Sequence, residues 1–336
     1  MSSKRILSLF GLIFSAIIII YLATQLNRQE LINSLRSIRF VYLPLLIVLM
    51  VILNILRALR WKHLLKTDTI PATKNLFEAI IVGFTATFVL PLRAGEFVRA
   101  FYISKLENVF FIGAFASIVI ERIFDVLALL VLFSCTLVGL PNMPTLVVLG
   151  AKSMALLATV MIAVIAVAYK KPQFVINTAN FCGHWLLPKK LYPLLDKFLN
   201  FTHEFLHGLQ SIKHFSSLIF VIIYTALIWL LVSAFYWVSL LALGYSAGFF
   251  MGIVVTVIVA LAIAAPSAPG FIGTYQAGCI IALSTLLGLS ETFAITYSVI
   301  THILQAIFII ATGFYYLARR GLCLQELVKR QPDLPL

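Results

Sequence analysis

The sequence predicts an all-α protein, a polytopic membrane helical bundle of about six full spans plus two re-entrant helical hairpins. Its 336 residues are 62% hydrophobic and 11% charged, and the mean hydropathy of +1.06 is far above that of a soluble domain. Several apolar runs are near the roughly 20 residues that a helix needs to cross a bilayer. Two shorter runs end in stretches that contain Pro and Gly, which is typical of re-entrant helices. We therefore expect residues 1–336 to form a single integral membrane domain.

The positive charge is spread over the connecting segments. The net charge is +13, but Lys and Arg do not gather on one soluble face, so we expect no nucleic-acid partner. The positive-inside rule explains their placement instead, and it predicts a multi-pass protein of the cell (inner) membrane with both termini in the cytoplasm. The densest group follows the second span and comprises Arg57, Arg60, Lys62, Lys66 and Lys74.

The first half, about residues 1–170, begins with an apolar run at about Ile6–Leu22. This run is longer than the roughly 7–15 residues of a signal-peptide core, so we interpret it as an uncleaved anchor. A second span is predicted at about Val41–Leu56. The run Leu76–Leu90 is short for a crossing and suits a re-entrant half-helix that enters from the cytoplasmic side. The apolar stretch Val109–Leu140 fits either one tilted helix or a hairpin arm followed by a span.

A span at about Leu146–Tyr169 leads to a polar segment, about residues 171–214, which we expect to be a cytoplasmic amphipathic connector at the membrane interface. The second half, about 215–320, would enter its hairpin from the outer face, so the halves form a possible inverted repeat. Its predicted spans are about Ser216–Leu243 and Phe293–Leu317, its short apolar segments are Phe249–Ala264 and Ala277–Leu289, and residues 321–336 form a short cytoplasmic tail.

The first break is the stretch Leu90-Pro-Leu-Arg-Ala-Gly-Glu-Phe-Val-Arg99. Pro91 cannot continue a helical hydrogen-bond ladder and Gly95 lowers helix stability, so the preceding helix should end here. Irregular backbone at membrane depth is tolerated only where protein or a water-filled cavity satisfies its polar groups. We therefore expect a sheltered polar site that contains Arg93, Glu96 and Arg99.

Arg93 and Arg99 are candidates for a clamp that binds phosphate or another anionic headgroup, because a guanidinium fork matches phosphate oxygens bidentately. The alternative is that both are cations at the cytoplasmic rim that follow the topology rule. Glu96 is expected to orient one of these arginines rather than to act as an acid or base.

A second charged group, Glu121, Arg122 and Asp125, lies in the following apolar run. Glu121 and Asp125 are four residues apart and share one face of a helix. Two carboxylates so placed can bind a cation or form part of a proton relay, or they can pair with Arg93, Arg99 or Arg122. The sequence leaves both alternatives open.

The second break contains Pro269, Gly270, Gly273 and Gln276. The glycines are expected to form the loop, and their amides can also hold an anion at the start of the next helix. His302, in the last predicted span, fits either a group that titrates during transport or a neutral, hydrogen-bonded packing residue.

No cofactor, metal site or catalytic residue is assigned. The four cysteines are far apart, and no CxxC pair or Cys/His ligand spacing occurs. His203 and His207 are four residues apart, but no carboxylate motif such as HExxH accompanies them, so we expect an interfacial solvated face.

Three blocks resemble the flippase-like family that includes the lysylphosphatidylglycerol synthase transmembrane region. They are Pro91-x-Arg93-x-Gly95-Glu96-x-x-Arg99, Glu121-Arg122-x-x-Asp125 and Pro269-Gly270-x-x-Gly273. The resemblance implies a multi-span core associated with lipid synthesis or translocation, here without the soluble aminoacyl-transferase domain of some relatives. Two positions depart from the family pattern: Phe271 replaces a glycine, and Gln276 stands where a glutamate is common. Gln276 can hydrogen-bond a headgroup but carries no charge and takes up no proton.

Three functions fit these features. The first is a lipid or lipid-linked-substrate translocase that binds an anionic phospholipid or a polyprenyl-phosphate-linked substrate in a midplane cavity. The second is a membrane-embedded enzyme that modifies a lipid headgroup with Glu96, Glu121 or Asp125 as acid or base. The third is an accessory subunit of an envelope-lipid pathway. A homo-oligomer is compatible with each of them.

Overall fold

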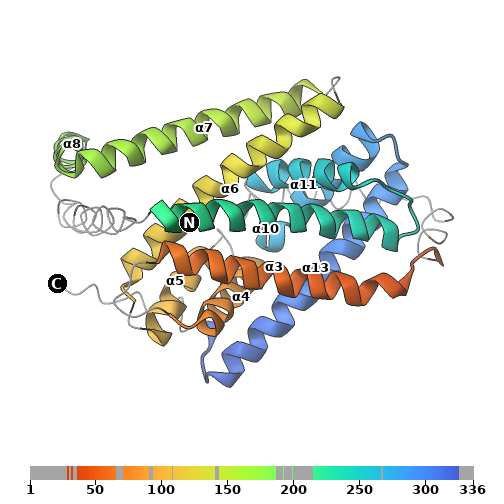
Figure 1. The fold of residues 1–336 in the computed structure, drawn as a ribbon, viewed down its shortest axis with the longest axis horizontal. Coiled ribbons are helices and arrows are strands. Elements are labelled where there is room, and N and C mark those ends of the chain that lie inside the picture. The colour runs from red at the N-terminus through yellow and green to blue at the C-terminus, as the bar shows by residue number, and fades with distance from the viewer. Residues whose placement is uncertain are drawn as a thin grey trace.

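The computed structural model describes residues 36–65, 71–90, 94–107, 109–140, 144–186, 215–265 and 268–324, together with the single residues 29, 32, 192 and 199. Every regular element in these ranges is a helix, which confirms the all-α prediction (Figure 1). The main helices are α3 (Leu43–Leu64), α4 (Thr73–Val89), α5 (Gly95–Leu106), α6 (Phe111–Gly139), α7 (Thr145–Lys170), α8 (Pro172–Leu186), α10 (Phe215–Ala242), α11 (Phe249–Ala264), α12 (Thr274–Ile280) and α13 (Glu291–Arg319). Three short turns complete them, η1 (Phe40–Tyr42), η4 (Pro269–Phe271) and the π-helical η5 (Ile281–Leu286).

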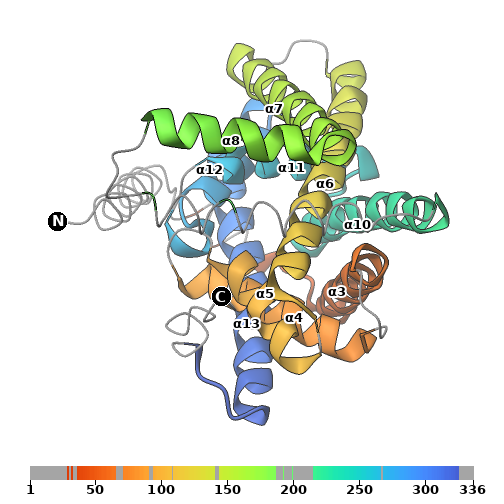
Figure 2. The same ribbon diagram turned by 90° about the vertical axis from the view of Figure 1, so that its left-hand side faces the viewer.

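Three of the described helices are long and apolar enough to cross a membrane, over Phe40–Leu64, Leu218–Ala242 and Glu291–Arg319. The stretch 109–140, whose form the sequence left open, is one helix of 29 residues, α6. The predicted anchor at residues 6–22 and the connector beyond residue 186 lie outside the described ranges, apart from the isolated residues 192 and 199. Helix α8 turns sharply away from the end of α7 (Figure 2), as an interfacial helix would.

The second predicted span is shorter at its C-terminal end than the helix in the structure, α3. The sequence placed its end at Leu56 because a group of Lys and Arg follows, but α3 continues to Leu64. Arg60 is buried in the bundle with 1% of its surface exposed. Its charge is accommodated because acidic side chains of α6 meet it there. Part of the basic group therefore belongs to the interior of the protein.

Both short apolar segments end at the predicted breaks. Helix α4 ends at Val89 and α5 begins at Gly95, while α11 ends at Ala264 and α12 begins at Thr274. In each pair the second helix packs back against the first, and a glycine permits the close approach. A Cβ atom on Gly95 would collide with the Gly83 carbonyl and the Thr87 hydroxyl of α4. A Cβ atom on Gly278 of α12 would lie 2.9 Å from the Val259 Cα atom of α11.

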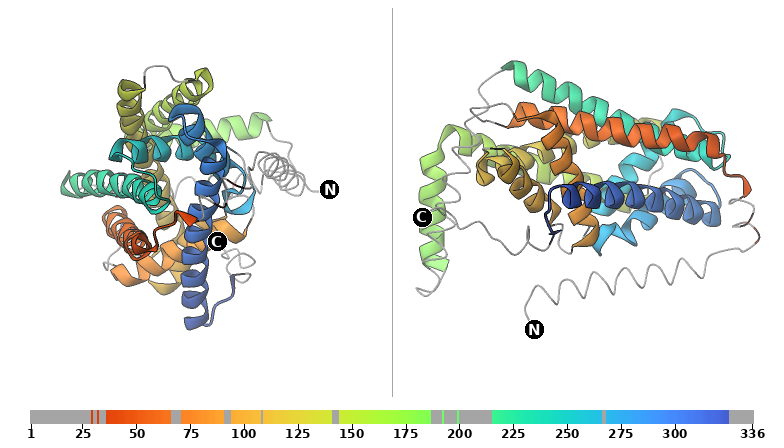
Figure 3. Two further views of the ribbon diagram at one scale, coloured as in Figure 1. Left: turned by 90° about the vertical axis from the view of Figure 1, so that its right-hand side faces the viewer. Right: turned by 90° about the horizontal axis from the view of Figure 1, so that it is seen from below.

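The two halves of the chain pack against each other along α3 and α10, which run antiparallel (Figures 1 and 3). At one end the Arg39 N–H donates to the Ala242 carbonyl at 2.7 Å, and at the other the rings of His63 and Phe220 stack 4.9 Å apart. Helix α4 also packs on α13, and α11 packs on α6. Each helix that precedes a break therefore contacts a long helix of the other half.

Helices α4 and α13 are held together by specific contacts at two points. The Thr85 hydroxyl hydrogen-bonds to the Ile309 carbonyl at 2.9 Å, and a Cβ atom on Gly313 would collide with Thr85. Near the start of α4, Arg320 forms an ion pair with the buried carboxylate of Glu78, with 2.8 Å between Nη2 and Oε2. The hydrogen bond that Arg320 donates to Glu78 raises the pKa of its guanidinium.

We predict that Gly95→Ala destabilises the protein by about 1–3 kcal/mol, because the added methyl group overpacks the contact between α4 and α5. Gly113→Ala in α6 is the matched control. A Cβ atom there meets nothing within 4 Å, so stability should stay the same or rise. Thermal unfolding in detergent measures both variants. Equal melting temperatures for the two variants would contradict the packing described here.

Candidate functional site

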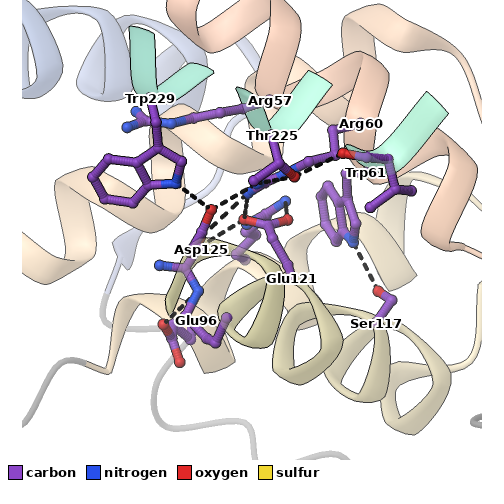
Figure 4. A network of polar contacts seen from close by, with 12 residues as sticks. Arg57, Arg60, Trp61, Glu96, Ser117, Glu121, Asp125, Thr225 and Trp229 are labelled. Carbon is purple, nitrogen blue, oxygen red and sulfur yellow. Dashed lines mark hydrogen bonds and ion pairs between the residues drawn. The ribbon is translucent and has the colours of Figure 1, made fainter. Parts of the chain in front are cut away.

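A group of five charged side chains, of which Arg122 is 41% exposed and the other four are buried, joins α3, α5 and α6 (Figure 4). We call it the arginine–carboxylate cluster, and it consists of Arg60, Arg99, Glu121, Arg122 and Asp125. Glu121 and Asp125 lie one helical turn apart on α6, so that both carboxylates face the neighbouring helices. Arg60 comes from α3 and Arg99 from α5.

Each carboxylate of the cluster is shared by more than one guanidinium. Arg99 donates to both oxygens of Glu121, with Nη1–Oε1 and Nη2–Oε2 distances of 3.0 and 2.9 Å. Arg60 donates from Nη1 to Asp125 Oδ1 at 2.6 Å, and its Nη2 lies 3.1 Å from Glu121 Oε1. Arg122 Nη2 lies 2.7 Å from Glu121 Oε1 and 3.2 Å from Asp125 Oδ2. Such shared, charge-assisted hydrogen bonds are among the strongest polar contacts in proteins.

Aromatic side chains hold the cluster from two sides. The Arg99 guanidinium carbon lies 3.8 Å from the centre of the Trp61 ring, and the Trp61 indole donates to the Ser117 hydroxyl at 2.8 Å. On the other side the Trp229 indole of α10 donates to Asp125 Oδ1 at 3.1 Å. Helices α3, α5, α6 and α10 are thereby joined through one polar centre.

The structure shows where most of the charged site residues predicted from the sequence lie. Both Nη atoms of Arg99 face Glu121, so its guanidinium fork is engaged within the protein. Glu121 and Asp125 have arginine partners, which is one of the two alternatives that the sequence left open. Glu96 is half exposed, and its carboxylate lies 3.7 Å from Arg122 Nε. Arg93 lies outside the described residues. Within the described ranges, no group of His, Cys, Asp or Glu side chains is arranged to hold a metal ion.

The second break lies against the end of α4. Gly270 and Gly273 have φ values of +68° and +90°, which residues with a side chain rarely adopt. A Cβ atom on Gly270 would lie 3.1 Å from the Phe88 ring. The loop after α11 therefore packs against the last turn of α4.

Hydrogen bonds involving Gln276 and His302 stabilise this loop. The Gly273 N–H donates to Gln276 Oε1 at 2.7 Å, so the Gln276 Nε2 group is left as the donor to His302 Nδ1 at 3.0 Å. His302 Nε2 must then carry the proton that bonds to the Gly270 carbonyl at 2.8 Å. These hydrogen bonds define a neutral histidine. Of the two roles left open for His302, the geometry therefore matches the hydrogen-bonded packing role.

A cavity of about 200 Å³ lies beside the cluster, between the two halves of the chain. Among the described residues that line it, Arg57 of α3 is the charged one. The Arg57 guanidinium donates to Asn54 Oδ1 at 3.3 Å and lies 4.8 Å from the centre of the Phe84 ring, and it has no ion pair with another described residue. The other residues that line the cavity are Met50, Leu53, Asn54, Phe84, Phe88, Trp229, Val232, Phe235, Tyr236, Thr256, Val259, Ala260, Ile263, Phe271, Tyr275, His302, Gln305, Phe308 and Ile309.

Sequence reasoning missed Arg57 and Arg60 as site residues, because it assigned both to the cytoplasmic rim. Their spacing held the information. Asn54, Arg57 and Arg60 recur every three residues along an apolar helix, and such a polar stripe on a membrane helix indicates a face turned toward the interior of the bundle. Trp229 links the two sites, since it lines the cavity and bonds to Asp125.

Long apolar helices, two breaks and a buried charge cluster define a polytopic membrane protein with a polar interior. Residues 8–313 match the family described as the lysylphosphatidylglycerol synthase TM region, and the chain belongs to this family.

Two curated proteins are similar to parts of the chain. Glycosyltransferase AglD of Haloferax volcanii is 26% identical over 139 residues, which are 41% of this chain and 22% of that protein. A UPF0104 membrane protein of Methanocaldococcus jannaschii is 28% identical over 131 residues, which are 38% of this chain and 39% of that protein. The matches thus span well under half the length of these relatives. No solved structure matches the chain.

We predict that Asp125→Asn lowers stability by about 3–5 kcal/mol, because it removes one of the two carboxylates that pair with the buried Arg60 and leaves Glu121 alone with three guanidinium groups. Glu96→Gln removes a half-exposed carboxylate at 3.7 Å from Arg122 and should cost about 0–1 kcal/mol. Thermal or denaturant unfolding of the two purified variants compares them directly. A loss for Glu96→Gln as large as for Asp125→Asn would contradict the assignment of the cluster as the buried centre.

Proposed function

We propose that this chain is a translocase for a lipid or lipid-linked substrate, and that it binds the anionic headgroup in the cavity between its two halves. The observation that carries the proposal is Arg57, a cation in a mostly apolar cavity without an ion pair among the described residues. Ionisable groups inside membrane proteins are costly and commonly mark the path of a substrate. An anionic headgroup would supply the missing partner.

The place of the cavity supports transport. It is lined by α3 and α4 of the first half and by α10 to α13 of the second. Phe88 near the end of α4 and Phe271 in the second break both contribute to the lining. Substrate sites in secondary transporters lie between repeats, at helices that are interrupted near the midplane.

The arrangement of helices supports two related units. Helices α3 to α6 and α10 to α13 each consist of a long helix, a helix that ends at a break, a helix that packs back, and a second long helix. We propose that they form an inverted repeat, with α4–α5 and α11–α12 as re-entrant hairpins entering from opposite faces. Lys62 and His63 near the end of α3 then lie on the cytoplasmic side, in agreement with the positive-inside rule.

In this proposal the sequence-predicted residues divide into two groups. Arg99, Glu121, Arg122 and Asp125 hold the helices around the cavity, because their charges are engaged with each other. The loop that contains Pro269, Gly270, Gly273 and Gln276 forms one wall, because Gln276 and Gly270 fix His302 beside the cavity. Membership of a family named for lysylphosphatidylglycerol synthase and similarity to a glycosyltransferase are both consistent with a lipid-associated substrate.

We predict that Arg57→Ala reduces movement of a fluorescent anionic phospholipid across reconstituted liposomes by about tenfold or more, since it removes a charge-assisted hydrogen-bond donor. Arg319→Ala is the matched control, because Arg319 is an exposed arginine at the end of α13. A dithionite quenching assay measures the rate, and melting temperatures show that both variants are folded. An unchanged rate for Arg57→Ala would remove the basis of the proposal.

A further inference from the structure

The lining of the cavity restricts the chemistry of the headgroup. Arg57 supplies one positive charge, and none of the described residues that line the cavity is Asp or Glu. Asp125, which bonds to the lining residue Trp229, is not among the described lining residues and is engaged by Arg60, Arg122 and the Trp229 indole. A headgroup with an ammonium group would therefore meet a guanidinium and no carboxylate among the described lining residues.

His302 adds no second charge. The Gly273 N–H fixes the orientation of the Gln276 amide, and this amide and the Gly270 carbonyl together fix one proton on the imidazole. The ring is stacked on Tyr275, with 4.5 Å between ring centres. Protonation of Nδ1 would replace a hydrogen bond by a contact between two donors. Among its described lining residues, the cavity thus carries a single cation, Arg57, together with neutral polar groups.

Those neutral groups form a small hydrogen-bonding surface. Gln305 donates to the Tyr275 hydroxyl at 3.0 Å, and this hydroxyl lies 2.9 Å from the Thr301 hydroxyl. Tyr236 lines the cavity beside them, with its ring centre 6.4 Å from that of Tyr275. Hydroxyl and amide groups both donate and accept, so they match the hydroxyls of glycerol or of a sugar.

The size of the cavity limits the ligand to a headgroup. Its volume of about 200 Å³ is below the roughly 300–1,000 Å³ of sites that enclose drug-sized ligands. A whole lipid does not fit, so the hydrocarbon chains would remain in the bilayer.

We propose that the headgroup is a single phosphodiester joined to a neutral polyol and without an ammonium group, an inference that rests on the proposed function. Arg57 binds the phosphate, and the group around Tyr275 and Gln305 binds hydroxyls. Phosphatidylglycerol and a hexose linked to polyprenyl phosphate share this chemistry. Phosphatidylethanolamine and lysylphosphatidylglycerol do not, because each carries an ammonium group.

Native mass spectrometry of the purified full chain with an equimolar panel of these four lipids tests the inference. We expect at least one of the two polyol lipids to be bound about tenfold or more above both ammonium lipids, because the latter leave a charge unpaired. Preference for phosphatidylglycerol identifies a glycerophospholipid ligand, and preference for the polyprenyl lipid identifies a lipid-linked sugar. Equal binding of all four lipids, or preference for an ammonium lipid, overturns the inference.

Gln305→Glu gives a second test, because it places a carboxylate in the cavity with little change of shape. It should shift the ratio of polyol to ammonium lipid by about tenfold toward the ammonium lipids. Arg319→Glu adds a carboxylate at an exposed position outside the cavity and should leave the ratio unchanged. An unchanged ratio in folded Gln305→Glu protein counts against the inference.

The liposome assay separates this inference from the proposed function. If the lipids move across the bilayer without regard to headgroup, the headgroup assignment fails and the translocase remains. If the polyol lipids bind selectively but no lipid moves, the assignment stands and the translocase fails.

Discussion

The ion pairs between α3 and α6 are the contacts on which the arrangement of this protein depends. Arg60 is 1% exposed and bonds to Asp125 and Glu121, so three charges lie where neither water nor lipid could solvate them. Breaking such a buried pair is costly, whereas forming it offers little gain over an apolar contact. The cluster therefore specifies which helices meet and in what register. Helix α5 joins through Arg99, and α10 joins through Trp229.

The cavity is a consequence of this same centre. Arg57 lies one helical turn before Arg60 on α3, so the pairing of Arg60 with α6 directs Arg57 toward the space between the halves. Trp229 belongs to both regions, because its indole nitrogen bonds to Asp125 of the cluster (Figure 4) and the residue also lines the cavity. Structural and candidate binding functions are thus divided between neighbouring arginines of one helix.

The local features of this fold could be predicted from the sequence, and the distant pairings could not. Pro91, Gly95, Pro269 and Gly273 mark the two breaks because their backbone preferences act on the adjacent residues alone. The shared face of Glu121 and Asp125 follows from helical spacing in the same way. Arg60 and Asp125 are 65 positions apart, and the Gln276 amide meets His302 across 26 positions. No local pattern encodes these distances, so the rule for loop charges assigned Arg60 to the cytoplasm although an acidic partner buries it.

The joint between α4 and α13 limits how the halves can move. The Thr85 hydroxyl hydrogen-bonds to the Ile309 carbonyl of α13, and the helices are so close at Gly313 that a side chain there would collide with Thr85. Arg320 forms an ion pair with Glu78 near the start of α4. Sliding one helix past the other would break all of these contacts together. Helices α4 and α13, one from each half of the chain, must therefore travel as one rigid body.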